Sequence, residues 1–199
     1  LREALAFANT NPGPDAITFA SGLLGQTITL SSGWLDATDT SALRVTGDVT
    51  LQGLGGAGIT LAIASGVQKR HLLVQSGASF TANNFTFASG NVADSGGAIF
   101  NQGTLTLNDV RFNNNSASQV GGAINNEGDT TLTGATFTSN AAGQAGAMQS
   151  VGMLNVTNST FTNNNSQFNG GALRLSGTAA ITGSTFNGNT VVNEGGGLI

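Results

Sequence analysis

Ten acids are the residues best able to do acid–base or metal chemistry: Glu3, Asp15, Asp36, Asp39, Asp48, Asp94, Asp109, Glu127, Asp129 and Glu194. Enzymes that cut acidic polysaccharides need clustered carboxylates, often with calcium, and a nearby base or acid. Because the sequence repeats about every 25 residues, two acids share a face only if they occupy matching repeat positions. The column of Asp109 continues as Gly134, Asn158 and Gly183. Glu127 and Asp129 also stand alone in their columns, so we expect solvated turn acids and no catalytic pair.

The only basic cluster is Lys69-Arg70-His71. It could supply a base or an anion contact, but we interpret it as an exposed turn that leads into a strand at Leu72-Leu73-Val74. Since His71 is the only histidine, a Ser-His-Asp triad would have to use it, and no nucleophile-elbow motif accompanies it.

Two further segments could bind ions or phosphate. Asp36-Ala37-Thr38-Asp39 could hold calcium together with nearby carbonyls, although Asx-type turn bonding is the commoner use of such residues. The glycine-rich segment Gly53–Gly58 lacks the strand–loop–helix context and the Lys of a phosphate loop, so we interpret it as a turn or bulge between early coils. The sequence therefore predicts no catalytic residue, no cofactor and no metal site.

The composition excludes several classes of protein. Charged residues make up 8% of the 199 residues, against roughly 25% in an ordinary soluble domain, and the net charge is −4. This balance disfavours a nucleic-acid partner. The absence of Cys excludes a disulfide scaffold and a thiolate zinc site. No apolar run is long enough for a membrane helix, so we expect no membrane insertion within this segment.

Internal repeats determine the predicted architecture. The first series is Gly96-Gly97-Ala98-Ile99, Gly121-Gly122-Ala123-Ile124, Ala145-Gly146-Ala147-Met148, Gly170-Gly171-Ala172-Leu173 and Gly195-Gly196-Gly197-Leu198. The second series is Phe87, Phe112, Phe137, Phe161 and Phe186, with Asn115, Asn140, Asn164 and Asn189 each three residues after its Phe. The third, five residues before each Phe, is Ala82, Leu107, Leu132, Val156 and Ile181. Three series with one period indicate a solenoid.

The apolar residues of each repeat alternate, which is typical of strands with one buried face. We expect three short strands per coil, near Ala98-Ile99, Leu105–Leu107 and Val110–Phe112, and hence a parallel β-helix. The Phe series then forms an aromatic ladder in the core, and the Asn series an amide ladder at a turn. The Gly-Gly pairs allow a backbone conformation or close approach that a Cβ would block. Gly90 stands where Asn is expected and Ala145 where Gly is expected, which we interpret as sequence drift.

The first 79 residues are less regular. The spacing of Leu1, Ala4, Leu5 and Ala8 predicts an amphipathic helix that caps the N-terminal end of the solenoid. Strands are expected at Ala16–Phe19, Thr27–Leu30, Ala42–Val45, Val49–Leu51, Ile59–Ile63 and Leu72–Val74. We divide the chain into a capping helix and turn (1–15), irregular coils (16–79) and regular coils (80–199). Because the sequence stops inside the fifth Gly-Gly copy, we expect further coils or a partner beyond Ile199.

The chain resembles a known family. Leu1-Arg2-Glu3-Ala4, Ile17-Thr18-Phe19 and Thr27-Ile28-Thr29-Leu30 are similar to the start of bacterial CSLREA-type surface proteins. The Gly-Gly-Ala-Ile and Phe-x-x-Asn repeats resemble those of polymorphic outer-membrane proteins. The resemblance implies a secreted or surface-displayed bacterial protein, usually longer than this chain. Together with the chirality of parallel crossovers, it predicts an all-β, right-handed parallel β-helix with coils of about 25 residues.

The function expected from these features is structural or adhesive. A stiff solenoid with outward Thr, Asn, Ser and Gln columns suits broad contacts with cell-surface glycans or other protein chains, including self-association through an open C-terminal end. The main alternative is a polysaccharide-active lyase or hydrolase, and a second is a self-assembling filament or surface-layer subunit. Two columns of aligned threonines suggest ice binding as a further hypothesis: Thr133, Thr157 and Thr182, and Thr136, Thr160 and Thr185. Asn108 and Arg111 interrupt these columns one coil earlier, which disfavours it.

Overall fold

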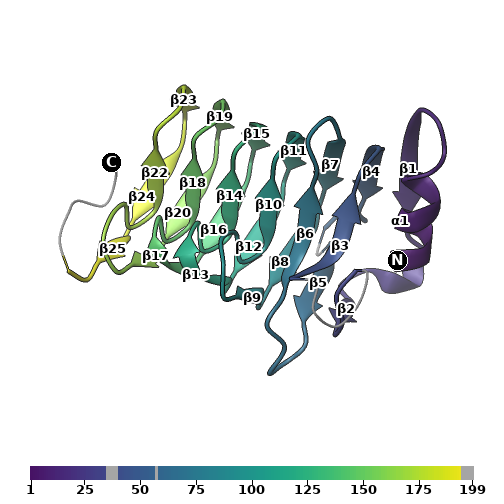
Figure 1. Ribbon diagram of the computed structural model, residues 1–199, viewed down its shortest axis with the longest axis horizontal. Helices are drawn as coiled ribbons and strands as arrows, with labels where there is room; N and C mark the ends of the chain where they lie inside the picture. The colour runs from purple at the N-terminus through teal and green to yellow at the C-terminus, as the bar shows by residue number, and fades with distance from the viewer. Residues whose placement is uncertain (35–39, 57, 194–199) are drawn as a thin grey trace.

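The computed structural model of the protein describes residues 1–34, 40–56 and 58–193. Figure 1 shows an elongated β-solenoid with one short helix at its N-terminal end. Pairing between the named strands is parallel throughout, and each strand pairs with strands of neighbouring coils. The expected parallel β-helix architecture and the coil period of about 25 residues are therefore confirmed.

Four parallel sheets run along the solenoid. Sheet A contains β1 (Pro14–Thr18), β4 (Asp48–Gln52), β7 (Ser79–Asn83), β11 (Thr104–Asn108), β15 (Asp129–Thr133), β19 (Leu154–Thr157) and β23 (Ala179–Thr182). Sheet B contains β2 (Thr27–Leu30), β5 (Ile59–Ile63), β8 (Phe85–Ala88), β12 (Arg111–Asn113), β16 (Thr136–Thr138), β20 (Thr160–Thr162) and β24 (Thr185–Asn187).

The other two sheets differ in where they begin. Sheet C contains β3 (Ser41–Val45), β6 (Arg70–Val74), β10 (Ile99–Asn101), β14 (Ile124–Asn126), β18 (Met148–Ser150) and β22 (Leu173–Leu175). Sheet D contains β9 (Asn91–Val92), β13 (Ser116–Val120), β17 (Ala141–Gln144), β21 (Asn165–Ser166) and β25 (Thr190–Val191). Besides the strands and the N-terminal helix, the described part contains one short 3₁₀ turn, η1 (Ser21–Leu23).

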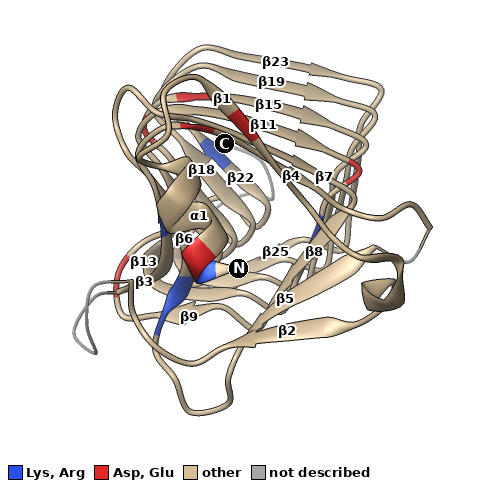
Figure 2. Cartoon of the chain, turned by 90° about the vertical axis from the view of Figure 1, so that its right-hand side faces the viewer, with Lys and Arg blue, Asp and Glu red and all other residues tan. Residues whose placement is uncertain are grey.

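The expectation of three strands per coil is wrong, because sheet D adds a fourth strand to each regular coil. Its strands are short, and their buried residues are small: Val92, Ala117 and Ala142 form a cluster separate from the main core. Such small residues do not produce the strong apolar alternation by which sequence analysis recognises a strand. Figure 2, viewed towards the N-terminal end of the solenoid, shows the strands stacking in successive coils and only sparse charged segments.

The Phe series forms the predicted aromatic ladder on sheet B. The rings of Phe112, Phe137, Phe161 and Phe186 stack with centroids 4.6–4.7 Å apart and planes within 12° of parallel. Phe87 continues the ladder at 5.4 Å. Like residues stack on like because parallel in-register pairing places each repeat position directly beside its counterpart in the next coil.

The Asn series forms the predicted amide ladder beside the Phe ladder. Asn115, Asn140 and Asn164 are fully buried, and each Nδ2 donates to the Oδ1 of the next Asn at 2.9–3.0 Å. Each Nδ2 also donates to a Phe backbone carbonyl in the preceding coil, such as that of Phe112. A second ladder, which sequence analysis missed, joins Asn101 to Asn126 and then to Ser150 at the end of the sheet C strands.

The corners of the coils require left-handed backbone conformations. Positive φ angles recur in one column at Asn84, Asp109, Gly134, Asn158 and Gly183, and in a second at Ser89, Asn114, Ser139, Asn163 and Gly188. Gly, Asn and Asp tolerate this conformation best, so the column of Asp109 is a turn column, as predicted. Ala145 keeps the positive φ of the first glycine of its repeat.

In the four described copies of the Gly-Gly repeat, the second glycine is required by close packing, as predicted. A Cβ on Gly122 would overlap the carbonyl oxygen of Gly146 in the next coil. The interpretation of Gly90 as drift is wrong for the same reason, since a Cβ there would overlap the carbonyl oxygen of Gly97. Gly90 instead ends the amide ladder by donating its backbone N–H to the Oδ1 of Asn115 at 2.9 Å.

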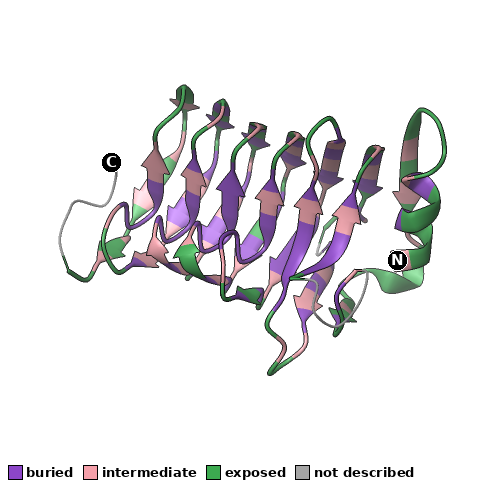
Figure 3. Ribbon diagram, viewed as in Figure 1, coloured by how far each residue is buried: buried purple, intermediate pink, exposed green. Residues whose placement is uncertain are grey.

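The helix α1 (Arg2–Ala8) packs on the first coils with Leu5 and Ala8 buried, as expected for a cap, whereas Ala4 is exposed. Asn9 fixes the end of the helix, because its Nδ2 donates to the carbonyl of Arg44 and its Oδ1 accepts the N–H of Thr46. Figure 3 shows buried positions running through the strands and exposed positions gathered at the helix and at many of the loops. None of the helices in the described part of the chain is long and apolar enough to cross a membrane.

Candidate functional site

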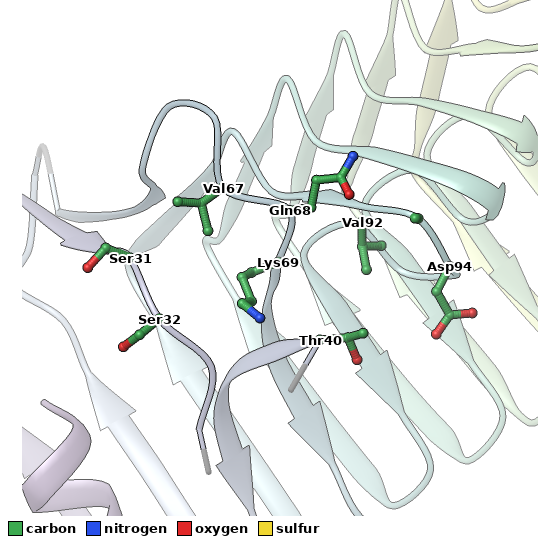
Figure 4. Close-up of a pocket in the computed structure, with 9 residues that line it drawn as sticks. Ser31, Ser32, Thr40, Val67, Gln68, Lys69, Val92 and Asp94 are labelled. Carbon is green, nitrogen blue, oxygen red and sulfur yellow. The ribbon is translucent and has the colours of Figure 1, made fainter. Parts of the chain in front are cut away.

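A hollow lies in the solenoid where sheet D begins. Within the described residues no sheet D strand precedes its first strand, β9, and Asn91 makes an antiparallel bridge with Lys69. The hollow has a volume of about 500 Å³. Its described lining residues, from four stretches of chain, are Ser31, Ser32, Thr40, Val67, Gln68, Lys69, Val92, Ala93 and Asp94 (Figure 4).

The interpretation of Lys69-Arg70-His71 as an exposed turn is wrong. Lys69 is 8% exposed, Arg70 2% and His71 0%, and β6 already begins at Arg70. The strand register explains the burial of His71. Leu72 pairs with Ile99, which places His71 beside Ala98, a fully buried position. The cluster therefore belongs to the wall and core of the solenoid.

Arg70 holds the acid of the hollow in place. Its guanidinium donates to the carboxylate of Asp94 at 2.6 Å, and the same guanidinium lies 5.1 Å from the ring centroid of Phe100. The Asp94 side chain remains 42% exposed, whereas that of Arg70 is 3% exposed. Asp94 is thus a fixed, solvent-accessible hydrogen-bond acceptor at the edge of the hollow.

His71 faces the core and does not line the hollow. Its Nε2 lies 3.0 Å from the carbonyl oxygens of Leu61 and Ala88, and its ring packs edge-on against Phe87. Both partners are acceptors, so Nε2 carries the proton and donates it. Burial lowers the pKa of His71 to about 4, because the charged form loses its hydration, while the two carbonyls act in the opposite direction. His71 is therefore a neutral structural residue at pH 7.

This burial makes folding stability dependent on pH. Since the pKa of His71 falls from 6.5 in the unfolded chain to about 4 when folded, the unfolded state binds more protons below pH 6.5. We expect the free energy of unfolding to be largest above pH 6.5 and to fall by about 2 kcal/mol between pH 7 and pH 5. Urea unfolding followed by circular dichroism at both pH values measures the change.

The matched variant is His71→Gln, which keeps an amide donor and cannot be protonated. Because the ordinary pKa values of Asp and Glu lie near 4, the variant should lose most of the pH dependence in this window, whatever its stability at pH 7. An unchanged slope in His71→Gln would show that another group is responsible.

The prediction that Asp129 stands alone in its column is wrong, because the sheet A register places Asp48 in the same column, separated from it by Ser79 and Thr104. Glu127 accepts from Gln102, Asp15 accepts from Asn11, and Asp109 occupies its turn column. Within residues 1–34, 40–56 and 58–193, no group of three or more His, Asp or Glu side chains could hold a metal ion. The candidate calcium segment Asp36–Asp39, Glu194 and the fifth Gly-Gly copy lie outside the described residues.

The glycine-rich segment is the connection between β4 and β5, in agreement with the expected turn, although Ala57 lies outside the described residues. Gly53 is buried against the carbonyl oxygens of Asn83 and Asn84, where a Cβ would overlap them. This glycine therefore serves coil packing.

The outer faces of sheets A and B carry polar columns that follow the strand register. On sheet A, Thr133 pairs with Thr157 and then Thr182, and on sheet B, Thr136 pairs with Thr160 and then Thr185. Asn108 and Arg111 precede these columns in the coil before, as the sequence indicated. These faces offer hydroxyls and amides with little charge.

Comparison with known proteins identifies the type of repeat. The family model of the Chlamydia polymorphic membrane protein repeat matches residues 109–127. This stretch contains Phe112 of the aromatic ladder, Asn115 of the amide ladder beside it, and the Gly-Gly copy Gly121–Ile124. No curated protein and no solved structure matches the chain. The matched repeat and the parallel solenoid together fit a surface-type β-helix built of polymorphic outer-membrane-protein repeats.

Proposed function

We propose that this solenoid of polymorphic-membrane-protein-type repeats is an extracellular, surface-displayed bacterial module with a structural and adhesive role. The observation that carries the proposal is the combination of a rigid ladder-stacked core with outer faces that are polar and nearly uncharged. The core fixes the spacing of the outer columns, so the same contact can be repeated from coil to coil.

The outer columns suit ligands rich in hydroxyl groups. Thr and Asn side chains donate and accept hydrogen bonds, and they recur on adjacent strands about 4.8 Å apart. Only 8% of the residues are charged and the net charge is −4, so strong binding to phosphate-rich polymers is not favoured. Cell-surface glycans and glycoproteins are the partners that this surface fits best.

The proposal is tested by measuring binding of the purified chain to immobilised cell-surface glycoproteins by surface plasmon resonance. We expect binding that is weak per site, that changes little between low and high salt, and that falls after enzymatic removal of the glycans. Salt-insensitive binding is expected because the contact faces carry few charges. Failure to bind any glycoprotein preparation, or to adhere to whole cells, would contradict the adhesive role.

We further propose that the protein acts by binding and not by cleaving polysaccharides. Asp94 is held by Arg70, and His71 is directed into the core. Asp48 and Asp129, which share a column of sheet A, are separated by Ser79 and Thr104. Incubation with pectin-like and other acidic polysaccharides should therefore release no unsaturated or reducing products. Product release that depends on Asp94 or on added calcium would instead favour the lyase or hydrolase alternative.

A further inference from the structure

We propose that the hollow at the start of sheet D is a binding site for one neutral sugar unit of a glycan. This inference rests on the proposed adhesive function and assigns to it one specific site. The hollow is the volume lined by Ser31, Ser32, Thr40, Val67, Gln68, Lys69, Val92, Ala93 and Asp94. At about 500 Å³, it lies within the size range of small-ligand pockets, roughly 300–1,000 Å³.

The hollow is a consequence of the chain topology. The regular coils have a strand in each of four sheets, whereas the first strand of sheet D is β9. In the described part of the preceding coils no strand continues this side of the solenoid, and Lys69 makes an antiparallel bridge with Asn91 instead. A recess remains between the described segments.

Two basic residues fix the walls of the recess. Arg2 donates to the hydroxyl of Ser32 at 2.8 Å and to its carbonyl at 2.9 Å, which joins the capping helix to this wall. On the opposite wall, Arg70 holds the Asp94 carboxylate. A site whose side chains are already positioned loses less conformational entropy when a ligand binds.

The lining has the chemistry that a sugar ring needs. The hydroxyls of Ser31, Ser32 and Thr40 can donate and accept, as can the Gln68 amide, and the Asp94 carboxylate accepts. Figure 4 shows the Lys69 side chain, which is 8% exposed, extending between the segments that carry Ser32 and Thr40.

The apolar and the charged lining residues favour a neutral sugar over an acidic one. Val67 and Val92 supply small apolar surfaces for the C–H groups of a ring. Among the described lining residues the charged side chains are Lys69, which is 8% exposed, and Asp94, which is 42% exposed. The more accessible of these two charges is the Asp94 carboxylate, which accepts from sugar hydroxyls and repels the carboxylate of an acidic sugar. A neutral hexose or N-acetylhexosamine unit fits this combination better than a uronic or sialic acid.

The test uses saturation-transfer NMR of the full chain with a panel of methyl glycosides of neutral hexoses, N-acetylhexosamines, glucuronic acid and sialic acid. Affinity for the best neutral sugar is then measured by calorimetry for the wild type and for Ala93→Phe, which fills the hollow from an exposed position. We expect at least a tenfold loss of affinity in Ala93→Phe. Gln68→Ala, at another exposed lining position, should weaken binding about threefold to tenfold.

Ala180→Phe is the matched control, because Ala180 is also an exposed alanine but lies on β23, whose coil does not line the hollow. Its affinity should equal that of the wild type. Equal binding by Ala93→Phe and wild type would overturn the site while leaving the adhesive function intact. Preference for an acidic sugar, or no sugar binding by a chain that still adheres to cells, would also overturn it. If the wild-type chain neither binds any sugar nor adheres to cells, both proposals are overturned.

Discussion

Replacing Phe137 by alanine is expected to lower the free energy of unfolding by about 3–5 kcal/mol. Phe137 is fully buried and lies between Phe112 and Phe161, whose ring centroids are 4.7 and 4.6 Å away. Removing the ring leaves a cavity that the neighbouring coils cannot close, because in-register strand pairing on both sides fixes their separation. Urea unfolding monitored by circular dichroism and by hydrogen exchange gives the magnitude.

Phe168→Ala is the matched control for this substitution. Phe168 is 50% exposed, so its removal should change stability by no more than about 0.5 kcal/mol. Because a solenoid can open from one end, hydrogen exchange should also show that amides near Phe137 lose more protection than those of β4. A loss below 1 kcal/mol in Phe137→Ala would mean that the Phe ladder does not hold the coils together.

Replacing Asn140 by leucine is expected to cost a similar amount, about 3–5 kcal/mol, although leucine is more apolar and of similar size. The Asn140 Nδ2 donates to the Phe112 carbonyl and to the Oδ1 of Asn164. Its Oδ1 accepts both the backbone N–H and the Nδ2 of Asn115. Leucine would deprive buried groups of these partners in both neighbouring coils, at about 1–3 kcal/mol for each unsatisfied group.

Asn155→Leu provides the comparison, because Asn155 is exposed on β19 and takes no part in the buried amide ladder. We expect it to change stability by about 0.5 kcal/mol or less. The double variant Asn115→Leu/Asn140→Leu should lose less than the sum of the two single losses, since each removes a partner of the other. Additive losses would show that the ladder does not act as a connected network.

The repeat columns could be predicted from the sequence for a definite physical reason. In a parallel in-register solenoid, neighbouring coils place equivalent residues side by side, so the same side chain is selected at each turn. Phe137 and Asn140 were therefore recognisable as ladder residues before their contacts were known. The turn column of Asp109 was recognisable because its members, Gly, Asn and Asp, are those that tolerate a positive φ.

The fourth sheet could not be predicted in this way. Its buried positions, such as Ala117 and Ala142, are too small to stand out as an apolar strand pattern. The role of Gly90 was hidden for a related reason. A single glycine in an Asn column resembles a chance substitution until the approach of the Gly97 carbonyl oxygen is known.

The sequence by itself determined the coil period, the two predicted ladders and the capping helix, because each rests on a pattern repeated along the chain or on local helix spacing. The tertiary structure alone decided the environment of Lys69-Arg70-His71, which occurs once. His71 lies in the register of Ala42 and Ala98, two small buried residues of the neighbouring coils that leave room for an imidazole ring. The recess beside Lys69 likewise depends on a sheet that begins only at β9. A single polar cluster carries no periodic signal, so its burial follows only from which coils lie above and below it.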